Sequence, residues 1–597
     1  MTSSHRFLLA ATLLLSAINL SASPARPVRH TATLPDGSTV TYRMVGDERF
    51  HYFVTDDGYP LVADGPTLYF AETADNGRMV SSGVAACDPQ YRNAATVAFL
   101  KKLDCETLIE KASLSDASSP RHSVSRKRAS SRAPESMSTT TFPTTGSPRG
   151  LVILAEYTDV KFSTPMPQEY FGDLLNLEGF NRDNATGSAR DYFIASSDGV
   201  FTPQFDVVGP VTLPHTQAYY GSNEPYDDAN ASYMIPDACD ILSAQGFDFS
   251  IYDCDKDGEI DNIYLIYAGR GESSGSIKDI NTVWPHSWEV GEMNRYYNGC
   301  LLNHYACSNE IDGGKPDGIG TFCHEFSHVM GLPDLYYTGN SHLTYLTPDT
   351  WSVLDVGCYL NDSRTPPLYS SFERMSLGWL QPKVIDKPGE YTLEPLADTN
   401  TALLVETDAE NEFFLFENRR KEGWDYYLRG EGMLVWHIDY DKEIWFSNTV
   451  NNSRSHQRVD LVEAITRTSP SASPSDPFPG ASNVTEYTAN TLPPSPSFKS
   501  WSHNNPGYPL TNIRTDGRLI RFTAGNSDDS AIDNVMSPDA VTVRGGEAIV
   551  ISGSDLPASV YTVAGTPVYQ GDSRRIILPT GLYIVRVGNH ITKVALH

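Results

Sequence analysis

The sequence predicts an α+β protein, in which a mixed central domain lies between β-rich domains toward both ends of the chain. Short runs of alternating apolar and polar residues, separated by Gly and Pro turns, occupy residues 31–102 and most of the chain after residue 382. Between them, the continuous apolar run at residues 151–155 is typical of a strand buried on both faces. A length of 597 residues, with 40% hydrophobic and 11% aromatic residues, indicates several folded domains rather than a disordered chain.

The chain is strongly acidic. It has 45 Lys and Arg residues against 74 Asp and Glu residues, which gives a formal net charge of −29 at pH 7. Nucleic acid and anionic membrane surfaces would be repelled by this charge, so we expect neither as a partner. The charge instead suits an exported protein whose carboxylates keep it soluble or bind hard cations.

Residues 1–23 have the layout of a secretory signal peptide. A basic start at His5 and Arg6 precedes an apolar run at residues 7–20 and then small residues at 21–23. The run has 14 residues, fewer than the roughly 20 that a membrane span requires, and no later segment is long enough to cross a bilayer. We therefore expect a protein without a membrane span that is secreted or attached to the cell surface.

Residues 24–113 are predicted to form a propeptide domain that is rich in β-strands and ends in a helix. The next segment, 114–148, consists mainly of Ser, Thr, Pro and basic residues, so it cannot offset the entropy of ordering and should be an exposed linker. Its basic site at residues 126–128 would be open to a processing protease. We therefore expect a latent precursor that is activated by cleavage at or near Arg128 or Arg149.

The central domain contains a metal-binding motif. His324 and His328 are four residues apart, so on a helix both imidazoles point from one face toward a single zinc ion. Glu325 then lies beside the ion, where it can take a proton from an activated water molecule. Gly331 is suited to end the helix with a positive φ, and the chain reversal would return Asp334 as a third ligand. The fourth position is left for water, as in catalytic zinc sites.

The third zinc ligand has two candidates in the central domain, which is predicted at residues 149–381. Asp334 follows a proline, and Pro-Asp is also common in turns that bind no metal. Glu373 is the rival ligand, because other enzymes with the His-Glu-x-x-His pattern take a Glu from a later helix. The sequence leaves both assignments open.

The motif resembles that of the immune inhibitor A-like secreted metallopeptidases, in the metzincin-like group with the pattern HExxHxxGxxD. The resemblance implies a zincin-like catalytic domain with zinc, protein or peptide substrates, and an N-terminal propeptide. Leu354 departs from the family, which usually has Met beneath the zinc, and Ser327 stands where the motif usually has Gly. Both replacements should preserve the zinc geometry. The similarity also extends to residues 283–286, 351–359, 369–380, 416–419 and 436–439.

An acidic loop upstream of the zinc motif predicts a calcium site. Carboxylates occur at alternate positions before Gly258, a spacing by which a loop wraps Ca²⁺. The loop is not a complete EF-hand, since Tyr264 stands where the final Glu would be, and the alternative is a solvated acidic turn. A calcium ion here would stabilise the fold and take no part in catalysis. The expected ligands are Asp253, Asp255, Asp257 and Asp261.

The chain has eight cysteines, and an even number in an exported protein suggests disulfides. Cys87 and Cys105 lie in the N-terminal domain and the other six in the central domain, and their spacing does not fix the pairing. Cys323 precedes a zinc ligand but would point about 100° away on the helix, so we do not expect it to bind the metal. Cys87 is expected to form a disulfide, and its alternative role is to cap the zinc of a latent enzyme.

The last two domains are predicted to be β-sandwich-like. Residues 382–525 should flank the active-site cleft, and residues 538–597 consist of short strands separated by Gly and Pro. The second segment resembles the C-terminal sorting domains of type IX secretion substrates. This resemblance implies a type IX-like export machinery as a partner.

These features predict a secreted zinc endopeptidase that is made as a zymogen and hydrolyses peptide bonds with Glu325 as general base. The alternative is a non-catalytic surface adhesin on a zincin-like scaffold. The intact Glu325 argues against an adhesin, because a protein that only binds does not need a general base.

Overall fold

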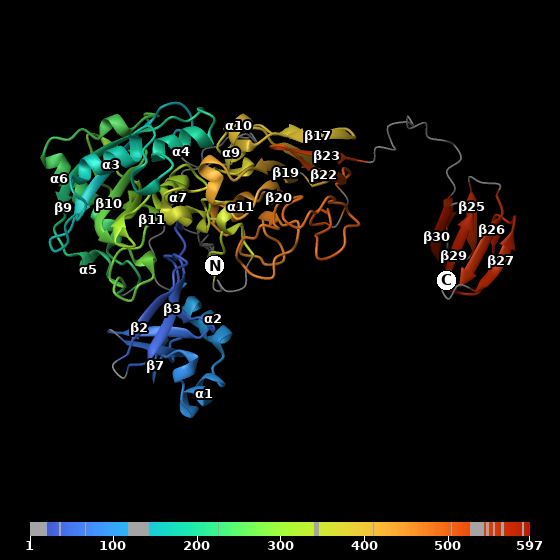
Figure 1. The fold of residues 1–597 in the computed structure, drawn as a ribbon, viewed down its shortest axis with the longest axis horizontal. Coiled ribbons are helices and arrows are strands. Elements are labelled where there is room, and N and C mark those ends of the chain that lie inside the picture. The colour runs from blue at the N-terminus through green and yellow to red at the C-terminus, as the bar shows by residue number, and fades with distance from the viewer. Residues whose placement is uncertain are drawn as a thin grey trace, which may run out of the picture. The chain divides into compact units, whose positions relative to one another are not determined.

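The computed structural model divides into two compact units, Met1–Gly525 and Asn526–His597, which are described separately (Figure 1). The predicted signal peptide up to residue 20 and the basic site at residues 126–128 lie outside the described residues. The described residues are 21–34, 37–65, 67–117, 142–224, 226–339, 346–409, 411–502, 504, 506–525, 542–544, 548–552, 556–562, 566–587 and 590–596.

The N-terminal domain is a six-stranded antiparallel sheet with its strands in sequence order, followed by two helices. Alternate residues of strand β3 are buried, and they pack with Leu61 and Phe70 in a single core. The hairpin between β3 and β4 turns at Gly46, where a Cβ atom would lie 2.1 Å from the Phe50 carbonyl oxygen, so only glycine fits. The elements are β2 (His30–Thr33), β3 (Thr39–Gly46), β4 (His51–Thr55), β5 (Pro60–Asp64), β6 (Thr67–Thr73), β7 (Met79–Ala85), α1 (Ala94–Leu100) and α2 (Cys105–Ala117).

The central domain is built on a seven-stranded mixed sheet with the order β1-β11-β14-β10-β8-β9, in which β15 also pairs with β14. Strands β9, β8, β10 and β14 are parallel, whereas β11 runs antiparallel to β14 and β1 runs antiparallel to β11. Residues 151–155 lie in β8, inside the sheet, and are fully buried, as their apolar run predicts. The strands are β1 (Ser21–Ala22), β8 (Arg149–Glu156), β9 (Gln204–Thr212), β10 (Ile263–Arg270), β11 (His286–Glu289), β14 (His304–Asp312) and β15 (Lys315–Pro316).

Helices cover both faces of this sheet (Figure 1). On one face Val152 and Leu154 share a core with α3, α4 and α7, and on the other face Leu151 and Ile153 share a core with α6. The pleat of β8 therefore divides its side chains between the two layers. The elements are α3 (Pro167–Asn176), α4 (Ala189–Ser196), α5 (Gln217–Tyr220), α6 (Met234–Ala244), α7 (Gly320–Val329), α8 (Leu360–Ser363), α9 (Ser371–Ser376) and a small hairpin of β12 (Tyr296–Tyr297) and β13 (Cys300–Leu301).

The predicted linker at residues 114–148 is shorter in the structure at both ends. Helix α2 continues to Ala117, and the chain joins the central core again at Phe142, which is 2% exposed and lies 5.0 Å from the Phe326 ring. The Thr144 carbonyl accepts a hydrogen bond of 2.6 Å from the Trp379 indole. The central domain therefore begins seven residues before the start that the sequence predicts, because one buried aromatic residue fixes the segment to the core.

Residues after 382 form a five-stranded sheet, β16-β18-β19-β20-β21, and a three-stranded sheet, β17-β23-β22. Phe414 and Phe416 face the core between these two sheets, whereas Leu415 and Trp436 belong to the core of the central domain. The larger sheet is thus buried on both faces. The elements are β16 (Lys383–Val384), β17 (Gly389–Leu393), α10 (Leu396–Thr399), β18 (Leu403–Glu406), β19 (Glu412–Arg419), β20 (Gly432–Asp439), α11 (Lys442–Phe446), β21 (Val459–Val462), β22 (Leu510–Asp516) and β23 (Leu519–Ala524).

The C-terminal unit contains two small antiparallel sheets, β24-β25-β28 and β27-β26-β29-β30. Ile549, Val560 and Val585 are buried in a core of its own. The elements are β24 (Thr542–Arg544), β25 (Ile549–Ser552), β26 (Ala558–Thr562), β27 (Pro567–Gly571), β28 (Arg575–Ile576), β29 (Gly581–Val587) and β30 (His590–Leu596).

No disulfide joins any of the eight cysteines, all of which lie within the described ranges. The expectation of disulfides is therefore wrong for this structure. Six of the cysteines are buried, where a thiol packs as a small apolar group. Among the helices that the structure describes, none is long and apolar enough to cross a membrane.

Candidate metal centre

Helix α7 carries the zinc motif, and glycines lie at its start and just beyond its end. It begins at Gly320, where a Cβ atom would lie 1.8 Å from the Cys358 carbonyl oxygen, so no larger residue is accommodated. It ends just before Gly331, whose φ of 93° reverses the chain and whose amide donates to the His328 carbonyl. The reversal directs the next residues back toward the face that carries the histidines.

Three ligand atoms meet on this face. His324 Nε2 lies 3.1 Å from His328 Nε2, and Asp334 Oδ1 lies 3.3 Å and 3.1 Å from the two nitrogens. A tetrahedral zinc ion bound to such atoms holds them about 3.3–3.4 Å apart. The Asp334 Oδ1 atom is buried and has no hydrogen-bond donor among the described residues. The residues present therefore fit one zinc ion, with His324, His328 and Asp334 as its ligands.

The backbone fixes the orientation of both imidazoles. His324 Nδ1 donates to the Val353 carbonyl at 2.7 Å, and His328 Nδ1 donates to the Leu332 carbonyl at 2.8 Å. A carbonyl oxygen can only accept, so each Nδ1 carries the proton. Each Nε2 is therefore left with a lone pair directed at the shared point, as metal binding requires.

Asn448 positions the third ligand and was not predicted from the sequence. Its side-chain amide donates to Asp334 Oδ2 at 2.5 Å, and its side-chain oxygen accepts from the Asp334 amide at 2.7 Å. Asn448 follows α11 with a φ of 53°, 114 residues after Asp334, so no local spacing could reveal it. Burial raises the pKa of Asp334, but His328 and His324 more than offset this effect, and the carboxyl pKa lies below its usual value.

Glu325 lies beside the three ligands and faces the N-terminal segment. One of its carboxylate oxygens is within 4.8 Å of ligand atoms of both histidines. Its Oε1 atom accepts a hydrogen bond of 2.8 Å from the Ser23 amide, and its Oε2 atom has no partner among the described residues. The side chain is fully buried, and burial raises its pKa to about 8. A carboxylate with this affinity for protons is suited to general acid and base chemistry near neutral pH.

Glu373, the rival third ligand, is engaged elsewhere. It is the third residue of α9, and its Oε2 atom accepts from the Ser370 amide at 2.5 Å in a capping box. Its Oε1 atom accepts from the Ser352 hydroxyl at 2.5 Å, and the same hydroxyl accepts from the Leu354 amide. Glu373 therefore supports the turn that supplies the Val353 carbonyl to His324. This geometry favours Asp334 as the ligand.

The two unusual residues of the motif are both buried beside the histidines. Leu354 is 1% exposed in the turn below the zinc motif, and its carbonyl accepts from the Leu335 amide. Ser327 donates to the Cys323 carbonyl one turn earlier at 2.6 Å and contacts the Tyr369 hydroxyl. Cys323 is buried in the apolar core of the domain. Neither replacement disturbs the approach of the two imidazoles.

The first described residues of the chain cross the metal centre. Strand β1 pairs antiparallel with β11, with Ser21 opposite Ser287 and Ala22 opposite His286. The next residue, Ser23, donates to Glu325 through its amide and accepts from the Trp284 indole through its carbonyl at 2.9 Å. Ser23, and not Cys87, is thus the residue through which the N-terminal segment contacts Glu325.

The β3–β4 hairpin brings further charged groups toward the centre. The Gly46 carbonyl accepts from the Ala25 amide at 2.8 Å, which joins the hairpin to the N-terminal segment. Asp47 and Glu48 are buried at the tip of the hairpin. Burial raises the pKa of both carboxyls, and the charge of Asp334 raises each of them further.

The predicted calcium ligands come together in part. The carboxylates of Asp253, Asp255 and Asp261 lie within 4.8 Å of one another, whereas Asp257 turns its carboxylate to the Glu259 amide. Asp261 is 2% exposed, and its Oδ1 atom has no hydrogen-bond partner among the described residues. Burial raises the pKa of Asp261 to about 6. This unpartnered oxygen makes the loop a candidate cation site with three carboxylates rather than four.

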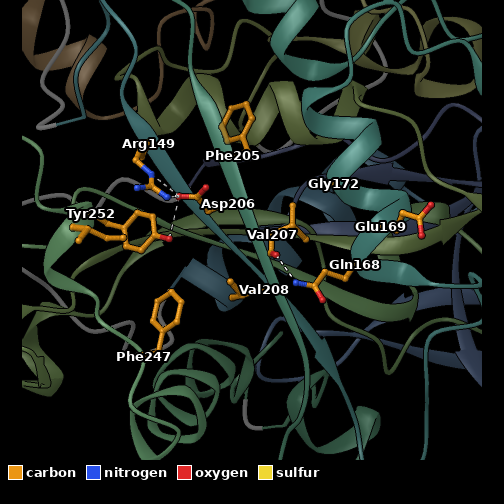
Figure 2. Close-up of a pocket in the computed structure, with 11 residues that line it drawn as sticks. Arg149, Gln168, Glu169, Gly172, Phe205, Asp206, Val207, Val208, Phe247 and Tyr252 are labelled. Carbon is orange, nitrogen blue, oxygen red and sulfur yellow. Dashed lines mark hydrogen bonds and ion pairs between the residues drawn. The ribbon is translucent and has the colours of Figure 1, made fainter.

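A surface pocket of about 660 Å³ lies beside the edge strand β9 (Figure 2). Arg149 and Tyr252 both contact Asp206 in it, at 2.6 Å and 3.2 Å, and Gln168 donates to the Val207 carbonyl. None of the metal-binding residues predicted from the sequence lines the pocket. Arg149 is therefore a structural residue at the start of β8.

The comparison with protein families supports the resemblance seen in the motif. Residues 154–384 match the catalytic domain of the immune inhibitor A peptidase family, M6. The chain is 23% identical over 322 residues to the pre-pro-metalloprotease PrtV of Vibrio cholerae serotype O1, which covers 44% of this chain and 34% of PrtV. It is 26% identical over 254 residues to immune inhibitor A of Bacillus thuringiensis subsp. alesti, which covers 35% of this chain and 36% of that protein.

These alignments cover about a third of the length of each relative. The matched range includes His324, Glu325, His328 and Asp334 and the turn below the histidines. The sorting-domain assignment of residues 538–597 lies outside the family match and stays a prediction. Residues 154–384 are therefore similar to the catalytic domain of the immune inhibitor A peptidases, M6.

Proposed function

We propose that this chain is a secreted zinc endopeptidase that is made as a latent precursor. The observation that carries the proposal is the convergence of three buried ligand atoms within 3.3 Å of one another, with Glu325 beside them. His324, His328 and Asp334 would hold the zinc ion. When bound, the ion polarises the scissile carbonyl and makes a water molecule more acidic.

Glu325 acts as the general base and then as the general acid. It takes the proton of the attacking water and passes it to the nitrogen of the leaving peptide. The hydrogen bond from the Ser23 amide to Glu325 supports this role, because a peptide nitrogen in the cleft is already within reach of the carboxylate. Burial raises the pKa of Glu325 above its usual value, which favours proton uptake by this carboxylate.

The edge strand β11 would bind the substrate. β1 adds to this edge as an antiparallel strand, and an extended substrate peptide can form the same backbone hydrogen bonds. Backbone pairing requires neither terminus of the peptide, so cleavage within a chain is expected. The substrates are therefore proteins or extended peptides.

The same contacts would make the precursor latent if the signal peptide is cut after residue 20. Residues 21–23 then remain on the chain and occupy the edge of β11 and the Glu325 carboxylate, so a substrate cannot enter until this segment leaves. Cleavage within residues 118–141 would free the N-terminal domain from the rest of the chain. Cleavage after Arg149 is disfavoured, because Arg149 lies in β8 and pairs with Gln204 of β9, whereas a protease needs an unpaired extended segment.

We propose further that the loop at residues 253–261 binds one calcium ion through Asp253, Asp255 and Asp261. Three carboxylates close together repel one another unless a cation lies between them, and the Asp261 Oδ1 atom has no other partner among the described residues. The ion would stabilise the loop before β10. Export through a type IX-like machinery by means of residues 538–597 remains a separate proposal from the sequence.

Replacement of Glu325 by Ala should abolish proteolysis and leave zinc bound, because it removes the base and none of the ligands. We expect casein cleavage by the activated full-length protein to fall on the order of 10²-fold or more. His328→Ala should lose both activity and zinc. Zinc content is measured by mass spectrometry after dialysis, and retained cleavage by Glu325→Ala would contradict the mechanism and leave Glu325 with a structural role.

Asp334→Ala should weaken zinc binding far more than Glu373→Ala, because only Asp334 contacts both imidazoles. Asn448→Ala should weaken zinc affinity by about 10–100-fold, since it frees Asp334 to turn away. Asn452→Ala is the matched control, because Asn452 bonds Thr338 instead. Affinities are measured by competition with a zinc-chelating dye. Stronger zinc loss in Glu373→Ala than in Asp334→Ala would assign the third ligand to Glu373.

Replacement of Arg121, Arg126, Lys127, Arg128 and Arg132 by Gln should keep the precursor inactive during limited trypsin treatment. The unmodified precursor should gain casein-cleaving activity as it is cut, at least tenfold above the uncut form. Arg149→Gln should be activated normally, because the bond after Arg149 lies in a paired strand. If the uncut variant digests casein as fast as the cut protein, the N-terminal domain does not confer latency.

Calcium should raise the melting temperature of the full-length protein, because a ligand that binds only the folded state stabilises it. Asp255→Asn should remove this response to calcium. Asp257→Asn is the control in the same loop and should retain the response, since its carboxylate lies outside the cluster. Differential scanning fluorimetry with added calcium or a calcium-selective chelator measures the shift. Equal responses of both variants would leave the loop as a solvated turn.

A further inference from the structure

An acidic pocket on the central domain is filled by a side chain of the N-terminal domain. His51, at the start of β4, lies with its Nε2 atom 3.3 Å from Glu272 Oε1. Asn223 contacts the same Glu272 oxygen at 3.4 Å, and Asp228 accepts from the Trp284 amide at 2.9 Å. We call these residues of the central domain, Asn223, Asp228, Glu272 and Trp284, the acidic pocket.

The acidic pocket has two buried carboxyl groups whose oxygens its occupant does not fully bond. Glu272 is 2% exposed, and its Oε2 atom has no hydrogen-bond partner among the described residues. Asp228 likewise has an unpartnered buried oxygen, Oδ1. Burial by itself would lower the pKa of His51, but Glu272 and then Asp227 raise it to about 10, so His51 is a cation in the precursor. One cation thus faces two buried carboxylates that are not fully bonded.

The acidic pocket lies next to the path of a peptide through the cleft. The centroid of the His51 ring lies 4.6 Å from that of the Trp284 ring, with the two planes tilted by 31°, and the Trp284 indole donates to the Ser23 carbonyl. The Ser23 amide in turn contacts Glu325, and the Arg26 amide donates to the Ser273 carbonyl, which adjoins Glu272. A peptide that contacts Glu325 as Ser23 does therefore reaches the acidic pocket about three residues further along, in the direction from Ser23 to Arg26.

We propose that, once the N-terminal domain has left, the acidic pocket binds a basic side chain of the substrate and so sets a sequence preference of the enzyme. This inference rests on the proposed function, because it concerns the substrate of the same site. Arginine is the preferred occupant, since its guanidinium can pair with the Glu272 carboxylate and stack on the Trp284 indole, the two groups that His51 contacts in the precursor. Lysine can supply the charge without the stacking.

The acidic pocket binds His51 in the precursor and would bind a substrate side chain in the active enzyme. His51 is the cation that pairs with Glu272 in the precursor, so its removal leaves Glu272 able to pair with a new cation. A peptide with a neutral residue at this position leaves the two carboxylates unpaired, and a peptide with an acidic residue is repelled. The preference is therefore expected to appear at one substrate position only.

The test uses full-length protein that trypsin has cut within residues 118–141, after which the trypsin is inactivated. Substrates are matched quenched fluorescent peptides that differ only by Arg, Lys, Gln or Glu at one position, scanned along four positions on each side of the cleaved bond. We expect kcat/KM to be about tenfold higher for Arg than for Gln at one position, a difference of about 1.4 kcal/mol. Glu should be the poorest residue there.

Variants assign this preference to the acidic pocket. Glu272→Gln should reduce the ratio of Arg to Gln cleavage to less than about threefold, and Glu272→Arg should reverse the preference toward Glu. Asp173→Asn, which removes a surface carboxylate paired with Arg182, is the control and should keep the tenfold ratio. An active wild-type enzyme without any preference, or an unchanged preference in Glu272→Gln, overturns the proposal.

A binding measurement separates this inference from the proposed function. If the cut protein cleaves no peptide, the endopeptidase assignment fails, and anisotropy of the same labelled Arg and Gln peptides then tests the acidic pocket directly. Tighter binding of the Arg peptide by about tenfold in the wild type, lost in Glu272→Gln, supports the pocket. Equal binding of the two peptides by the wild type overturns it, even if the variant does not fold.

Discussion

Three electron-pair donors meet within 3.3 Å at His324, His328 and Asp334, two of which are buried residues and the third partly buried. Such a contact is repulsive unless a cation lies between the atoms, so the surrounding fold must hold the donors together. Two backbone carbonyls fix the imidazoles, and Asn448 fixes the carboxylate. The glycine reversal after α7, the turn below the helix and the segment after α11 that carries Asn448 all serve to hold these atoms together.

Support for the site comes from parts of the chain that are far apart in sequence. Glu373 holds the turn at Ser352, which orients the Val353 carbonyl toward His324. The larger sheet after residue 382 sends alternate side chains into two cores, one of which surrounds α7. The β-rich domain is therefore part of the scaffold of the metal centre and not an appendage that only borders the cleft.

The local parts of this arrangement could be predicted from the sequence, because short-range geometry determines them. The spacing of His324 and His328 follows from the period of a helix, and the apolar run at 151–155 follows from burial on both faces. The contacts of Asn448, Phe142 and His51 could not be predicted, since each joins residues that only tertiary packing brings together. The cysteine count was misleading, because buried thiols in a large core need no disulfide.

The distance along the chain between Asp334 and Asn448 has a consequence for synthesis. The carboxylate is held in place only when a residue 114 positions later has been made and folded back. A loop of this length closes slowly compared with local helix formation. The zinc motif is thus translated well before the residue that holds Asp334, so under the proposed ligand set tight metal binding would follow the folding of the later domain.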